Sequence, residues 1–589
     1  MTSFQTLSEV LRHRAEIEGH RAAYTFLRDG EIEDRTITYA ELDQQSRALA
    51  AMLQEWQVRR PLLIYAPGLD FIVSFFACLY AGATPIPAGL HHASRIGRSL
   101  TRFSAIASEA EADAVLSMPR IIDRALGDPD FAVFTPALAG MRWLSTESPD
   151  LELAESWHEP EQLQEAPVFI QYTSGSTAAP KGVVVTQRNL IHNLRLCNEV
   201  EENNDTSVSL SWLPHSHDMG LIEAILLPAF AGYRAYLMSP AAFLSRPLRW
   251  LQAISRFRAT NSGGPNFAYD LCVEKISPEE RKALDLRSWR VAYNGAETIR
   301  KETLVRFRDV FQNCGFRSTA FYPVYGLAES TLLVSSDRQA DLPVFCDVDA
   351  TALGNGIVRS RPFSSDRTLS VVACGRGSGD ARIVIVNPDT LTACGPDEVG
   401  EIWISSPSVA SGYWQNPAET KRVFEAYLGK DHDGPFLRTG DLGFLRDGRL
   451  FVTGRIKDII NIRGFKHYPQ DIELTMASSH PAIQANGCAA FAISWDGMEQ
   501  LATVAEVQPQ WRHRTGDWQE QAIGAIQDAI TAGHGLAAHT IALAPYGTIP
   551  KTTSGKLQRH ACRNSLMEGT LKTTRLWSMN TQLSRIGIT

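Results

Sequence analysis

The stretch Gln171-Tyr-Thr-Ser-Gly-Ser-Thr-Ala-Ala-Pro-Lys-Gly-Val-Val-Val-Thr186 concentrates hydroxyls, glycines and one lysine. The apolar run Pro167-Val-Phe-Ile170 precedes it, and it ends in the strand-like Val183-Val-Val185. Glycines let a backbone turn so that its N–H groups converge on an anion, while hydroxyls and a mobile lysine add donors and positive charge. We therefore expect a phosphate-binding loop, with the candidate residues Thr173, Ser174, Gly175, Ser176, Thr177 and Lys181.

Two other interpretations of this stretch need to be considered. A Walker A loop requires Gly-x4-Gly-Lys-Ser/Thr, but the fifth residue after Gly175 is Pro180, which excludes that motif. A solvated turn between two strands remains open, because Ser and Thr are common in turns. Lys181, directly after Pro180 and between apolar strands, favours the phosphate loop.

The composition is that of an ordinary globular protein, since 44% of the 589 residues are hydrophobic and 21% are charged. This length allows at least two hydrophobic cores. The net charge of -8 and the lack of a basic block argue against a nucleic-acid partner. Nine scattered cysteines, without any Cys-x-x-Cys spacing, predict a reducing compartment and no structural zinc.

The first residues form an amphipathic helix start without the apolar core of a signal peptide, so we expect a cytoplasmic protein. Residues 71–87 superficially resemble a membrane segment. Their apolar run is shorter than the ~20 residues that a span needs, and Gly82, Pro85 and Pro87 interrupt it. We expect a buried helix followed by a buried strand, and no transmembrane segment.

Short apolar strands alternate with helices up to about residue 310. Residues 36–39 and 62–65 predict strands, and the apolar spacing from Ala40 onward predicts a helix. This alternation is typical of layered α/β subdomains with mostly parallel sheets. Beyond residue 330 the pattern predicts a β-rich, more antiparallel subdomain. A small α+β tail, with a helix over 518–532, is expected after Asp458.

Residues 210–221 place two histidines and an aspartate in a turn bounded by proline and glycine. His215 and His217 could ligate a metal, but no partner cluster with ligand spacing occurs elsewhere in the sequence. We favour a turn that lines a pocket. The residues expected to contact the substrate are His217, Asp218 and Met219.

Two motifs place a glycine and then a carboxylate after a strand-like run: Asn294-Gly-Ala-Glu297 and Tyr325-Gly-Leu-Ala-Glu-Ser330. Open α/β sheets bind ligands at the carboxyl ends of their strands. Each motif taken singly could equally be the N-cap region of a helix. Nucleotide-bound magnesium usually takes one or two protein carboxylates, so Glu329 is a candidate magnesium ligand.

Three polar elements lie closer to the C-terminus. Asp441, in Arg438-Thr-Gly-Asp-Leu-Gly443, could hold both ribose hydroxyls of a nucleotide or could serve only the turn. The run Gly454-Arg-Ile-Lys-Asp458 leads toward a helix started by Pro469. Lys556 lies in a polar loop, where a solvated surface role is the alternative.

The order of the motifs is more specific than any one of them. In chain order they are Tyr172-Thr-Ser-Gly-Ser-Thr, Tyr325-Gly-Leu-Ala-Glu, Arg438-Thr-Gly-Asp, Gly454-Arg-x-Lys-Asp and Pro550-Lys-Thr-Thr-Ser-Gly-Lys. This set resembles the adenylate-forming superfamily of acyl-CoA synthetases, luciferases and non-ribosomal peptide adenylation domains. Within it, residues 212–222 and 463–473 are most similar to the fatty acyl-AMP ligases.

Fatty acyl-AMP ligases carry an insertion after the Tyr-Gly-Leu-Ala-Glu motif. Residues 330–399 leave room for it, and we expect it around residues 340–375. One position departs from the family pattern, because Ala178 stands where the phosphate loop commonly has another glycine. Alanine costs little unless φ must be positive, so we expect a working, slightly stiffer loop.

The resemblance implies a large N-terminal adenylation domain over residues 1–457 and a small mobile C-terminal domain over residues 458–589, with Asp458 as the hinge. It implies that a fatty-acid carboxylate attacks the α-phosphorus of ATP, giving acyl-adenylate and pyrophosphate. The acyl group would then pass to the phosphopantetheine thiol of an acyl carrier protein. Positioning and stabilisation of phosphoryl charge would supply most of the catalysis.

The resemblance also assigns roles to residues. Lys556 would be catalytic, bridging the carboxylate and the α-phosphate, and Glu329 would hold magnesium. The residues at the nucleotide would be Thr173, Ser174, Gly175, Ser176, Thr177 and Lys181 at the phosphates, Gly295, Ala296, Glu297 and Tyr325 around adenine, Asp441 and Arg455 at the ribose, and also Gly326.

Two alternatives remain open. An acyl-CoA synthetase shares all of the nucleotide chemistry and differs only in its acceptor. A non-catalytic nucleotide- or carrier-binding protein belongs to another class, and the joint presence of Lys556, Glu329 and Asp441 weighs against it.

Overall fold

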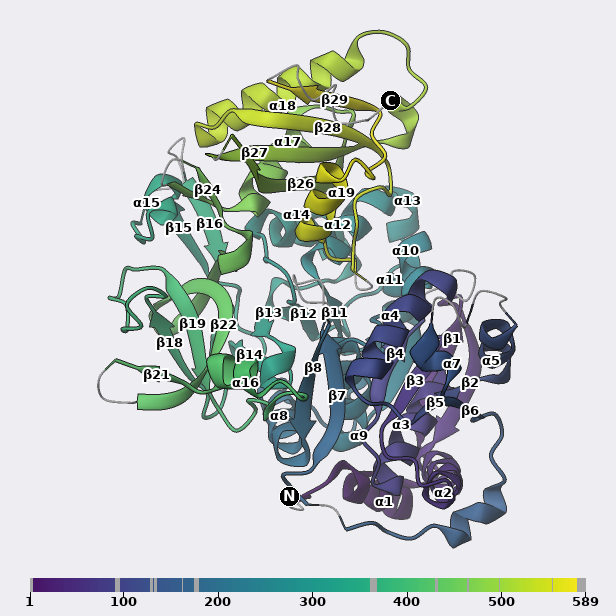
Figure 1. The fold of residues 1–589 in the computed structure, drawn as a ribbon. Helices are drawn as coiled ribbons and strands as arrows, with labels where there is room; N and C mark the ends of the chain where they lie inside the picture. The colour runs from purple at the N-terminus through teal and green to yellow at the C-terminus, as the bar shows by residue number, and fades with distance from the viewer. Residues whose placement is uncertain are drawn as a thin grey trace. The chain divides into compact units, whose positions relative to one another are not determined.

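The computed structural model describes residues 4–90, 96–127, 131, 135–161, 163–173, 180–360, 368–429, 433–462, 465–496, 498–552 and 555–579. Helices and strands are both abundant, which confirms the predicted α/β class (Figure 1). The chain divides into two compact units, unit 1 (Met1–Val344, Cys374–Val384 and Trp403–Thr439) and unit 2 (Phe345–Ala373, Ile385–Ile402 and Gly440–Thr589). The domain boundary at residues 457 and 458 remains a prediction.

Unit 1 contains a nine-stranded sheet with the order β17-β14-β13-β12-β11-β9-β10-β1-β2. The strands from β13 to β1 in this order run parallel, and antiparallel strands close both edges. The prediction of a mostly parallel sheet is therefore confirmed. The strands are β1 (Ala22–Arg28), β2 (Ile32–Thr38), β9 (Val208–Ser211), β10 (Arg234–Met238), β11 (Asn261–Gly264), β12 (Val291–Asn294), β13 (Phe321–Gly326), β14 (Leu333–Ser336) and β17 (Arg376–Gly377).

Helices lie between these strands in the chain, because parallel neighbours need crossover connections rather than hairpins. They bury an aromatic cluster in which the ring of Trp250 lies edge-on to those of Trp289 and Tyr269. The helices are α8 (Gln187–Val200), the π-helix η3 (Met219–Leu226), α9 (Leu227–Ala231), α10 (Pro240–Ser245), α11 (Leu248–Phe257), α12 (Asn266–Lys275), α13 (Pro278–Arg281) and α14 (Lys301–Phe311).

A second, fully parallel sheet of unit 1 has the order β4-β3-β5-β6. Its strands are β3 (Pro61–Tyr65), β4 (Ile86–Gly89), β5 (Ala114–Ser117) and β6 (Arg142–Ser145). Helix α3 (Leu69–Ala81) is apolar and almost wholly buried, and it ends at Gly82, whose φ of 73° suits a glycine C-cap. The buried helix and strand expected over residues 71–87 are thus confirmed.

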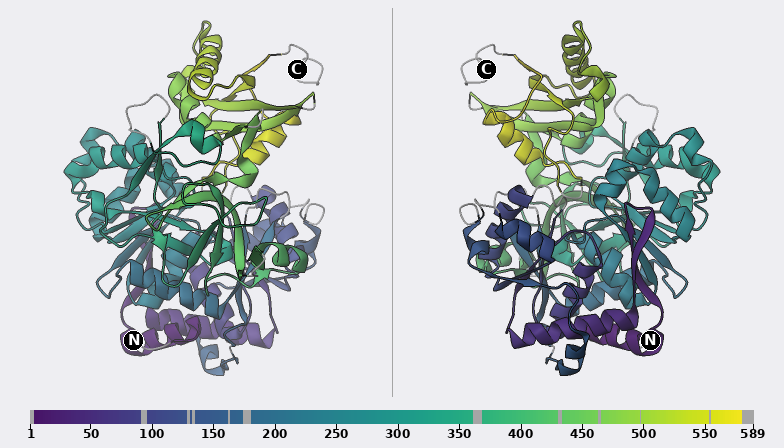
Figure 2. Two further views of the ribbon diagram at one scale, coloured as in Figure 1. Left: turned by 90° about the vertical axis from the view of Figure 1, so that its left-hand side faces the viewer. Right: turned by 90° about the vertical axis from the view of Figure 1, so that its right-hand side faces the viewer.

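The N-terminal helices α1 (Leu7–Glu18) and α2 (Tyr39–Glu55) lie beside one another, and α2 also packs on α3 (Figure 2). Each begins with a capping box, from Thr6 and from Thr38, which satisfies orphan backbone donors of the first turn. The helices α4 (Ile96–Glu109), α5 (Pro119–Leu126) and α7 (Pro136–Ala139) follow. None of the helices in the described ranges is long and apolar enough to cross a membrane.

On either side of the expected phosphate loop, β7 (Pro167–Thr173) and β8 (Lys181–Thr186) pair in antiparallel fashion, and β20 (Gly412–Tyr413) adds a third strand. Both flanking strands were predicted. The connection between them lies outside the described residues, and with it the candidates Ser174, Gly175, Ser176 and Thr177.

The β-rich part beyond residue 330 contains a sheet with the order β18-β19-β22-β21, and β23 also pairs with β22. Strand β22 runs antiparallel to both β21 and β23, as predicted for this region. A separate antiparallel pair joins β15 to β16 within the expected insertion. The elements are β15 (Phe345–Asp349), α15 (Ala350–Gly354), β16 (Thr368–Val372), β18 (Arg382–Val386), β19 (Gly400–Ser405), α16 (Pro417–Phe424), β21 (Ala426–Leu428), β22 (Asp433–Arg446) and β23 (Arg449–Arg455).

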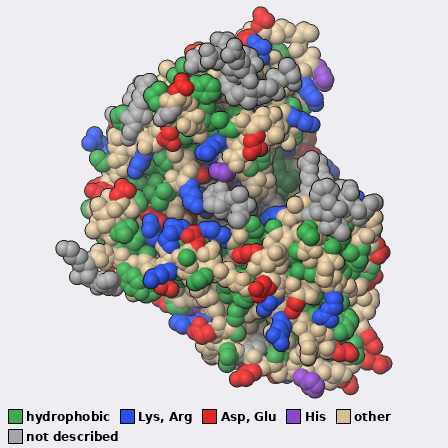
Figure 3. All heavy atoms as spheres, in the orientation of Figure 1, with side chains coloured by type: hydrophobic (Ala, Val, Ile, Leu, Met, Phe, Trp, Pro, Cys, Tyr) green, Lys and Arg blue, Asp and Glu red, His purple; other side chains and the backbone are tan. Residues whose placement is uncertain are grey.

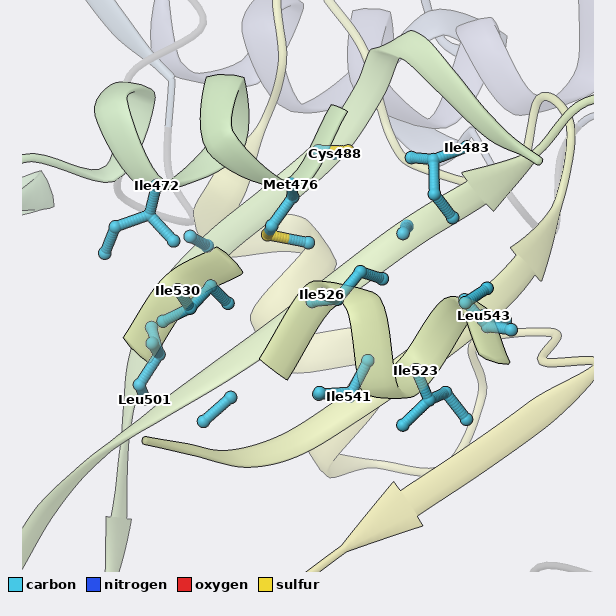
Figure 4. Packing of buried hydrophobic residues seen from close by; sticks show 14 of the residues in the cluster. Ile472, Met476, Ile483, Cys488, Leu501, Ile523, Ile526, Ile530, Ile541 and Leu543 are labelled. Carbon is cyan, nitrogen blue, oxygen red and sulfur yellow. The ribbon is translucent and has the colours of Figure 1, made fainter. Parts of the chain in front are cut away.

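The C-terminal part of unit 2 is built on a sheet of order β26-β27-β28-β29. Apolar residues of two helices, such as Ile472, Met476, Ile526 and Ile530, recur at spacings of four and form one core with the sheet (Figure 4). Helix α18, expected over 518–532, is Trp518–His534. The other elements are β24 (Ile460–Ile462), β25 (Phe465–His467), α17 (Pro469–Ser479), β26 (Ile483–Trp495), β27 (Met498–Val507), β28 (Ala538–Pro545), α19 (Arg559–Met567) and β29 (Arg575–Ser578).

Basic and acidic side chains are interspersed on the face shown in Figure 3. Many form exposed ion pairs, for example Arg575 with Glu520, whose side chains are each about half exposed. Such pairs contribute at most about 1 kcal/mol each. The fold therefore rests on its buried apolar clusters rather than on surface charge.

Candidate active site

Strand β8 begins at Lys181 and is paired on both of its edges. The register places Thr173 of β7 opposite Lys181, and Tyr413 of β20 opposite Val183. Two further backbone hydrogen bonds, of 3.1 and 2.8 Å, flank the β20 pairing. The backbone of Lys181, immediately after the expected phosphate loop, is thus fixed by sheet hydrogen bonds.

The ammonium group of Lys181 makes an ion pair with Glu419 and lies 5.0 Å from the ring centroid of Tyr413. Glu419 belongs to the first turn of α16, where its backbone N–H donates to the side chain of Asn416. Hydrogen bonds from Arg422, followed by those from Lys181, lower the pKa of Glu419 to about 2. Glu419 is therefore ionised near neutral pH and neutralises part of the charge of Lys181.

Glu329 contacts the same tyrosine. The hydroxyl of Tyr413 donates to Oε1 of Glu329 at 2.9 Å. The backbone on either side is anchored, since Ala410 N–H donates to the Glu329 carbonyl and the Thr331 hydroxyl donates to the Ser408 carbonyl. Burial, and then the negative charge of Glu329, raise the pKa of Tyr413, so its hydroxyl remains a donor.

The glycine-containing motifs after β12 and β13 lie side by side because these strands are parallel neighbours. A Cβ atom on Gly295 would lie 2.7 Å from Cγ2 of Val324, and one on Gly326 would lie 2.0 Å from the carbonyl oxygen of Leu332. Ala296 has a φ of 68°, which alanine rarely adopts. Close approach of the backbones thus requires both glycines, and the turn after β12 is strained.

The two remaining residues of these motifs differ in their surroundings. Tyr325 is buried in β13, opposite Ser335 of β14. The carboxylate of Glu297 accepts a hydrogen bond of 2.6 Å from the backbone N–H of Phe267, in the first turn of α12. This hydrogen bond satisfies a backbone donor at the start of α12, and the expected place of Glu297 at adenine remains a prediction.

The turn after β9 leads into the π-helix η3, where the sequence suggested only a turn. Asp218 pairs with His217 and accepts the backbone N–H of Met219 at 2.7 Å, which caps the helix. A Cβ atom on Gly220 would lie 2.0 Å from the carbonyl oxygen of Pro214, so the tight turn requires glycine. π-helical turns often occur at functional sites.

His215, the other histidine of this turn, is buried, and its ring centroid lies 4.0 Å from that of Phe71. Within the described ranges, no three His, Cys, Asp or Glu side chains gather closely enough to hold a metal ion. His215 thus packs as an aromatic side chain beside α3.

In unit 2, β22 and β23 bring two candidate residues together. Their register places Asp441 opposite Arg455, and the guanidinium Nε lies 2.9 Å from Oδ1 of Asp441. Asp441 is buried, whereas the side chain of Arg455 is 61% exposed. Gly440, with a φ of 71°, turns the chain before Asp441 and donates its N–H to Glu401. Asp441 and Arg455, the two residues expected at the ribose, therefore form an ion pair.

Lys556 lies in a loop that is closed by its own backbone. The Lys556 N–H donates to the hydroxyl of Thr552 at 3.0 Å, and the N–H of Thr552 donates to the Lys556 carbonyl at 2.6 Å. Gly555 has a φ of 87°, and Gln558 N–H donates to the Pro550 carbonyl. These bonds hold residues 555–558 against residues 550–552, just before α19 begins.

The structure thus groups the candidates within each unit. In unit 1, Lys181 and Glu329 meet at Tyr413, and the turns after β12 and β13 are adjacent. In unit 2, Asp441 contacts Arg455, while Asp458 ends the short 3₁₀ helix η7 (Ile456–Asp458).

Sequence reasoning missed Tyr413 and Glu419, the two contacts of Lys181. The glycine before Tyr413 and the Asn-Pro start of α16 are local signals for a turn and a helix. Neither signal indicates a partner more than 200 residues away, because that pairing is set by the β8–β20 register.

Residues 11–414 of the chain match the model of the AMP-binding enzyme family. The chain belongs to this family. A second description, the AMP domain of Disco-interacting protein 2-like proteins, matches residues 457–576. The first match contains the expected phosphate loop, and the second contains Lys556.

This AMP-binding enzyme is 44% identical over 582 residues to a medium-chain-fatty-acid–[acyl-carrier-protein] ligase of Moorena producens, with 96% of each chain covered. It is 34% identical over 607 residues to a long-chain-fatty-acid–AMP ligase of Mycolicibacterium smegmatis, covering 95% of this chain and 94% of that protein. A fatty acyl-adenylate ligase from L. pneumophila, solved with acyl adenylate and pyrophosphate, is 39% identical, with a TM-score of 0.75 and 98% of each chain covered. These similarities confirm the predicted resemblance to fatty acyl-AMP ligases.

Proposed function

We propose that this protein activates a fatty acid with ATP, releases pyrophosphate, and passes the acyl group to the phosphopantetheine thiol of an acyl carrier protein. The observation that carries the proposal is the contact of Tyr413 with both Lys181 and Glu329. Lys181 follows the expected phosphate loop, and Glu329 is the expected magnesium ligand. The similarity to an acyl-carrier-protein ligase over almost the full length of both chains supports the choice of acceptor.

The chemistry consists of two substitutions. A carboxylate oxygen of the fatty acid attacks the α-phosphorus of ATP, and the bond to the β-phosphate oxygen breaks, so that pyrophosphate leaves with the electron pair. The thiolate of the carrier then attacks the acyl carbonyl carbon, and AMP leaves. Neither step needs a covalent intermediate with the protein, so the residues act by positioning and by stabilising charge.

Lys181 would contact the phosphates once they displace Glu419 from its ammonium group. Glu329 fits a magnesium ligand, because its carboxylate is an anionic oxygen donor of the kind this hard cation prefers, and the Tyr413 hydroxyl holds it in position. Bound magnesium would neutralise charge on the phosphate oxygens. Gly295, Ala296, Glu297 and Tyr325 are proposed to frame adenine, and His217, Asp218 and Met219 to contact the substrate.

We also propose that residues 1–457 and 458–589 are the two functional domains, with Asp458 as the hinge and Lys556 supplied by the smaller one. The start of the second family match at residue 457 supports this boundary. Asp441 and Arg455 would share the ribose, for which their ion pair keeps both side chains in position. The nine cysteines, none of which forms a disulfide, support a cytoplasmic location.

Mass spectrometry of the products tests the acceptor. The protein is incubated with ATP, magnesium and a panel of fatty acids, first alone, then with coenzyme A, and then with a holo acyl carrier protein. We expect acyl-AMP in the first reaction, little acyl-CoA in the second, and acylated carrier in the third. An adenylate in a site protected from water accumulates until a thiol arrives.

The matched control is the same carrier protein without its phosphopantetheine arm. Rapid acyl-CoA synthesis by the wild-type protein would identify an acyl-CoA synthetase instead. Absence of pyrophosphate release with every fatty acid would favour the non-catalytic alternative. Deletion of residues 340–375, which include β15 and β16, should allow some acyl-CoA to form if the insertion restrains the smaller domain.

A further inference from the structure

Arg559, the first residue of α19, makes three bonds with its guanidinium group. Its Nε and Nη2 each donate to the carboxylate of Glu473 at 2.7 Å, and Nη1 donates to Oδ2 of Asp458 at 3.0 Å. The side chain of Arg559 is only 21% exposed, and that of Glu473 is 6% exposed. The two carboxylates raise the pKa of Arg559 against the opposing effect of burial. The guanidinium therefore remains charged.

The two carboxylates have different attachments. Glu473 lies in α17, and its Oε1 also accepts the backbone N–H of Ala490 in β26 at 3.0 Å. Its pair with Arg559 thus joins α17, β26 and α19 into one body. Asp458 precedes that body in the chain, at the end of η7. The hydrogen bond from Nη1 of Arg559 to Asp458 therefore connects this body to the expected hinge.

Arg559 also lies three residues after Lys556. The intervening chain is held, because Leu557 bridges to Lys551 and the Gln558 N–H donates to the Pro550 carbonyl. A displacement of Arg559 therefore moves the end of the loop that carries Lys556. One guanidinium group thus contacts the expected hinge and anchors the expected catalytic loop.

The contact constrains the two backbone torsions of Asp458 unequally. Its side chain branches at Cα, so rotation about φ moves the preceding chain and leaves the carboxylate in place against Arg559. Rotation about ψ would carry the carboxylate away with the preceding chain. An intact bond to Arg559 therefore restrains ψ and leaves φ free.

We propose that Arg559 is a positioning residue that fixes Asp458 to the body carrying Lys556, so that the domain rotation occurs on the N-terminal side of the Cα atom of Asp458. The inference rests on the proposed two-step function, in which the smaller domain takes different orientations for adenylation and for acyl transfer. Loss of the bond frees a second torsion, and the smaller domain then occupies its two working orientations in altered proportions.

The clean test is Asp458→Ala, which removes one carboxylate and leaves the buried pair of Arg559 with Glu473 intact. Replacing Arg559 itself by alanine would leave Glu473 buried without its partner and could unfold the domain. Asp458→Glu keeps the charge and serves as the conservative variant. Glu520→Gln, which removes the exposed partner of Arg575 in the same unit, is the control.

Two measurements are made on the full chain. Hydrogen exchange followed by mass spectrometry reports on residues 456–462 and 555–562, and needs no substrate. Rates of pyrophosphate release, and of acyl transfer from preformed acyl-adenylate to a holo carrier, report on the two half-reactions. Asp458→Ala should accelerate exchange in both segments by roughly tenfold and change the ratio of the two rates by a similar factor. Asp458→Glu should retain most of the protection, and Glu520→Gln all of it.

Unchanged exchange in both segments in Asp458→Ala would overturn the proposal. So would equal losses in the two half-reactions, since a purely structural role would lower both together. If the wild-type protein fails to activate fatty acids, the proposed function is wrong, and the exchange measurement alone decides whether Arg559 couples the two segments.

Discussion

The two lysines expected to handle phosphate are held in contrasting ways. Lys181 begins a strand that is paired on both edges, and its ammonium group is neutralised by Glu419 beside the ring of Tyr413. Lys556 lies in a short loop closed by Thr552, and the helix that follows the loop is anchored by Arg559. The first lysine is positioned by sheet register, and the second by a loop and one guanidinium group.

Under the proposed function, this difference separates the binding of phosphates from catalysis. A lysine on a paired strand keeps its place whether or not a nucleotide is bound, which suits ground-state recognition of phosphates. A lysine on a loop of a smaller domain can arrive after binding, which suits contact with the transition state. Four substitutions test this contrast, from the largest expected effect to the smallest.

Lys556→Ala should have the largest effect. It should remove the proposed charge-assisted contact to the α-phosphate, worth on the order of 3 kcal/mol in the transition state, and slow adenylation roughly 100-fold. ATP binding should persist, because β8 and Lys181 are untouched. Single-turnover formation of acyl-adenylate and equilibrium binding of ATP measure the two quantities. Adenylation at the wild-type rate would remove Lys556 from the catalytic step.

Glu329→Gln comes next. The substitution keeps the shape and can still accept the hydrogen bond of Tyr413, but it loses the negative charge that a hard divalent cation prefers. Adenylation should fall roughly tenfold at limiting magnesium and recover partly at high magnesium. A magnesium titration identical to that of the wild type would make Glu329 a structural residue of η6 (Ala328–Ser330).

Much of this arrangement was predictable, because it follows from local sequence. The strands that flank the expected phosphate loop, the turns after β12 and β13, and helix α17, which begins at Pro469, all have local signals of apolar runs, glycine or proline. The order of the motifs then identified the family. Close backbone approach explains why Gly295 and Gly326 stand where they do.

The remainder depends on contacts between distant segments. The pairing of Tyr413 with both Lys181 and Glu329 arises from β20 joining the β7–β8 hairpin, and strand register between distant segments has no local signal. The π-helix after Asp218 was expected as a turn, since its apolar residues suggest only burial. The ion pairs of Arg559 were missed because a single arginine is usually a solvated surface residue.

Tyr413→Phe should have a smaller effect than either charge removal. It deletes the hydroxyl that holds Glu329 but keeps the ring beside Lys181. Loss of a hydrogen bond worth about 1 kcal/mol should lower the adenylation rate roughly fivefold and raise the magnesium requirement. Tyr546→Phe, at a side chain that is 60% exposed, is the matched control. If Tyr413→Phe leaves the magnesium titration unchanged, the hydrogen bond does not position Glu329.

Glu419→Gln should have the smallest effect, and in the opposite direction. The variant removes the carboxylate that competes with phosphate for Lys181. Because a partly exposed ion pair is worth at most about 1 kcal/mol, the KM for ATP should fall only about threefold, with kcat unchanged. Because the pKa of Glu419 is about 2, below its ordinary value of 4.5, the pair is intact above pH 4.5 and is lost only as the pH falls toward 2. The ratio of variant to wild-type KM should therefore stay constant from pH 6 to 8.

Glu425→Gln, at an exposed carboxylate just after α16, controls for the change in net charge. A higher KM in Glu419→Gln would mean that Glu419 orients Lys181 for phosphate rather than competing with it.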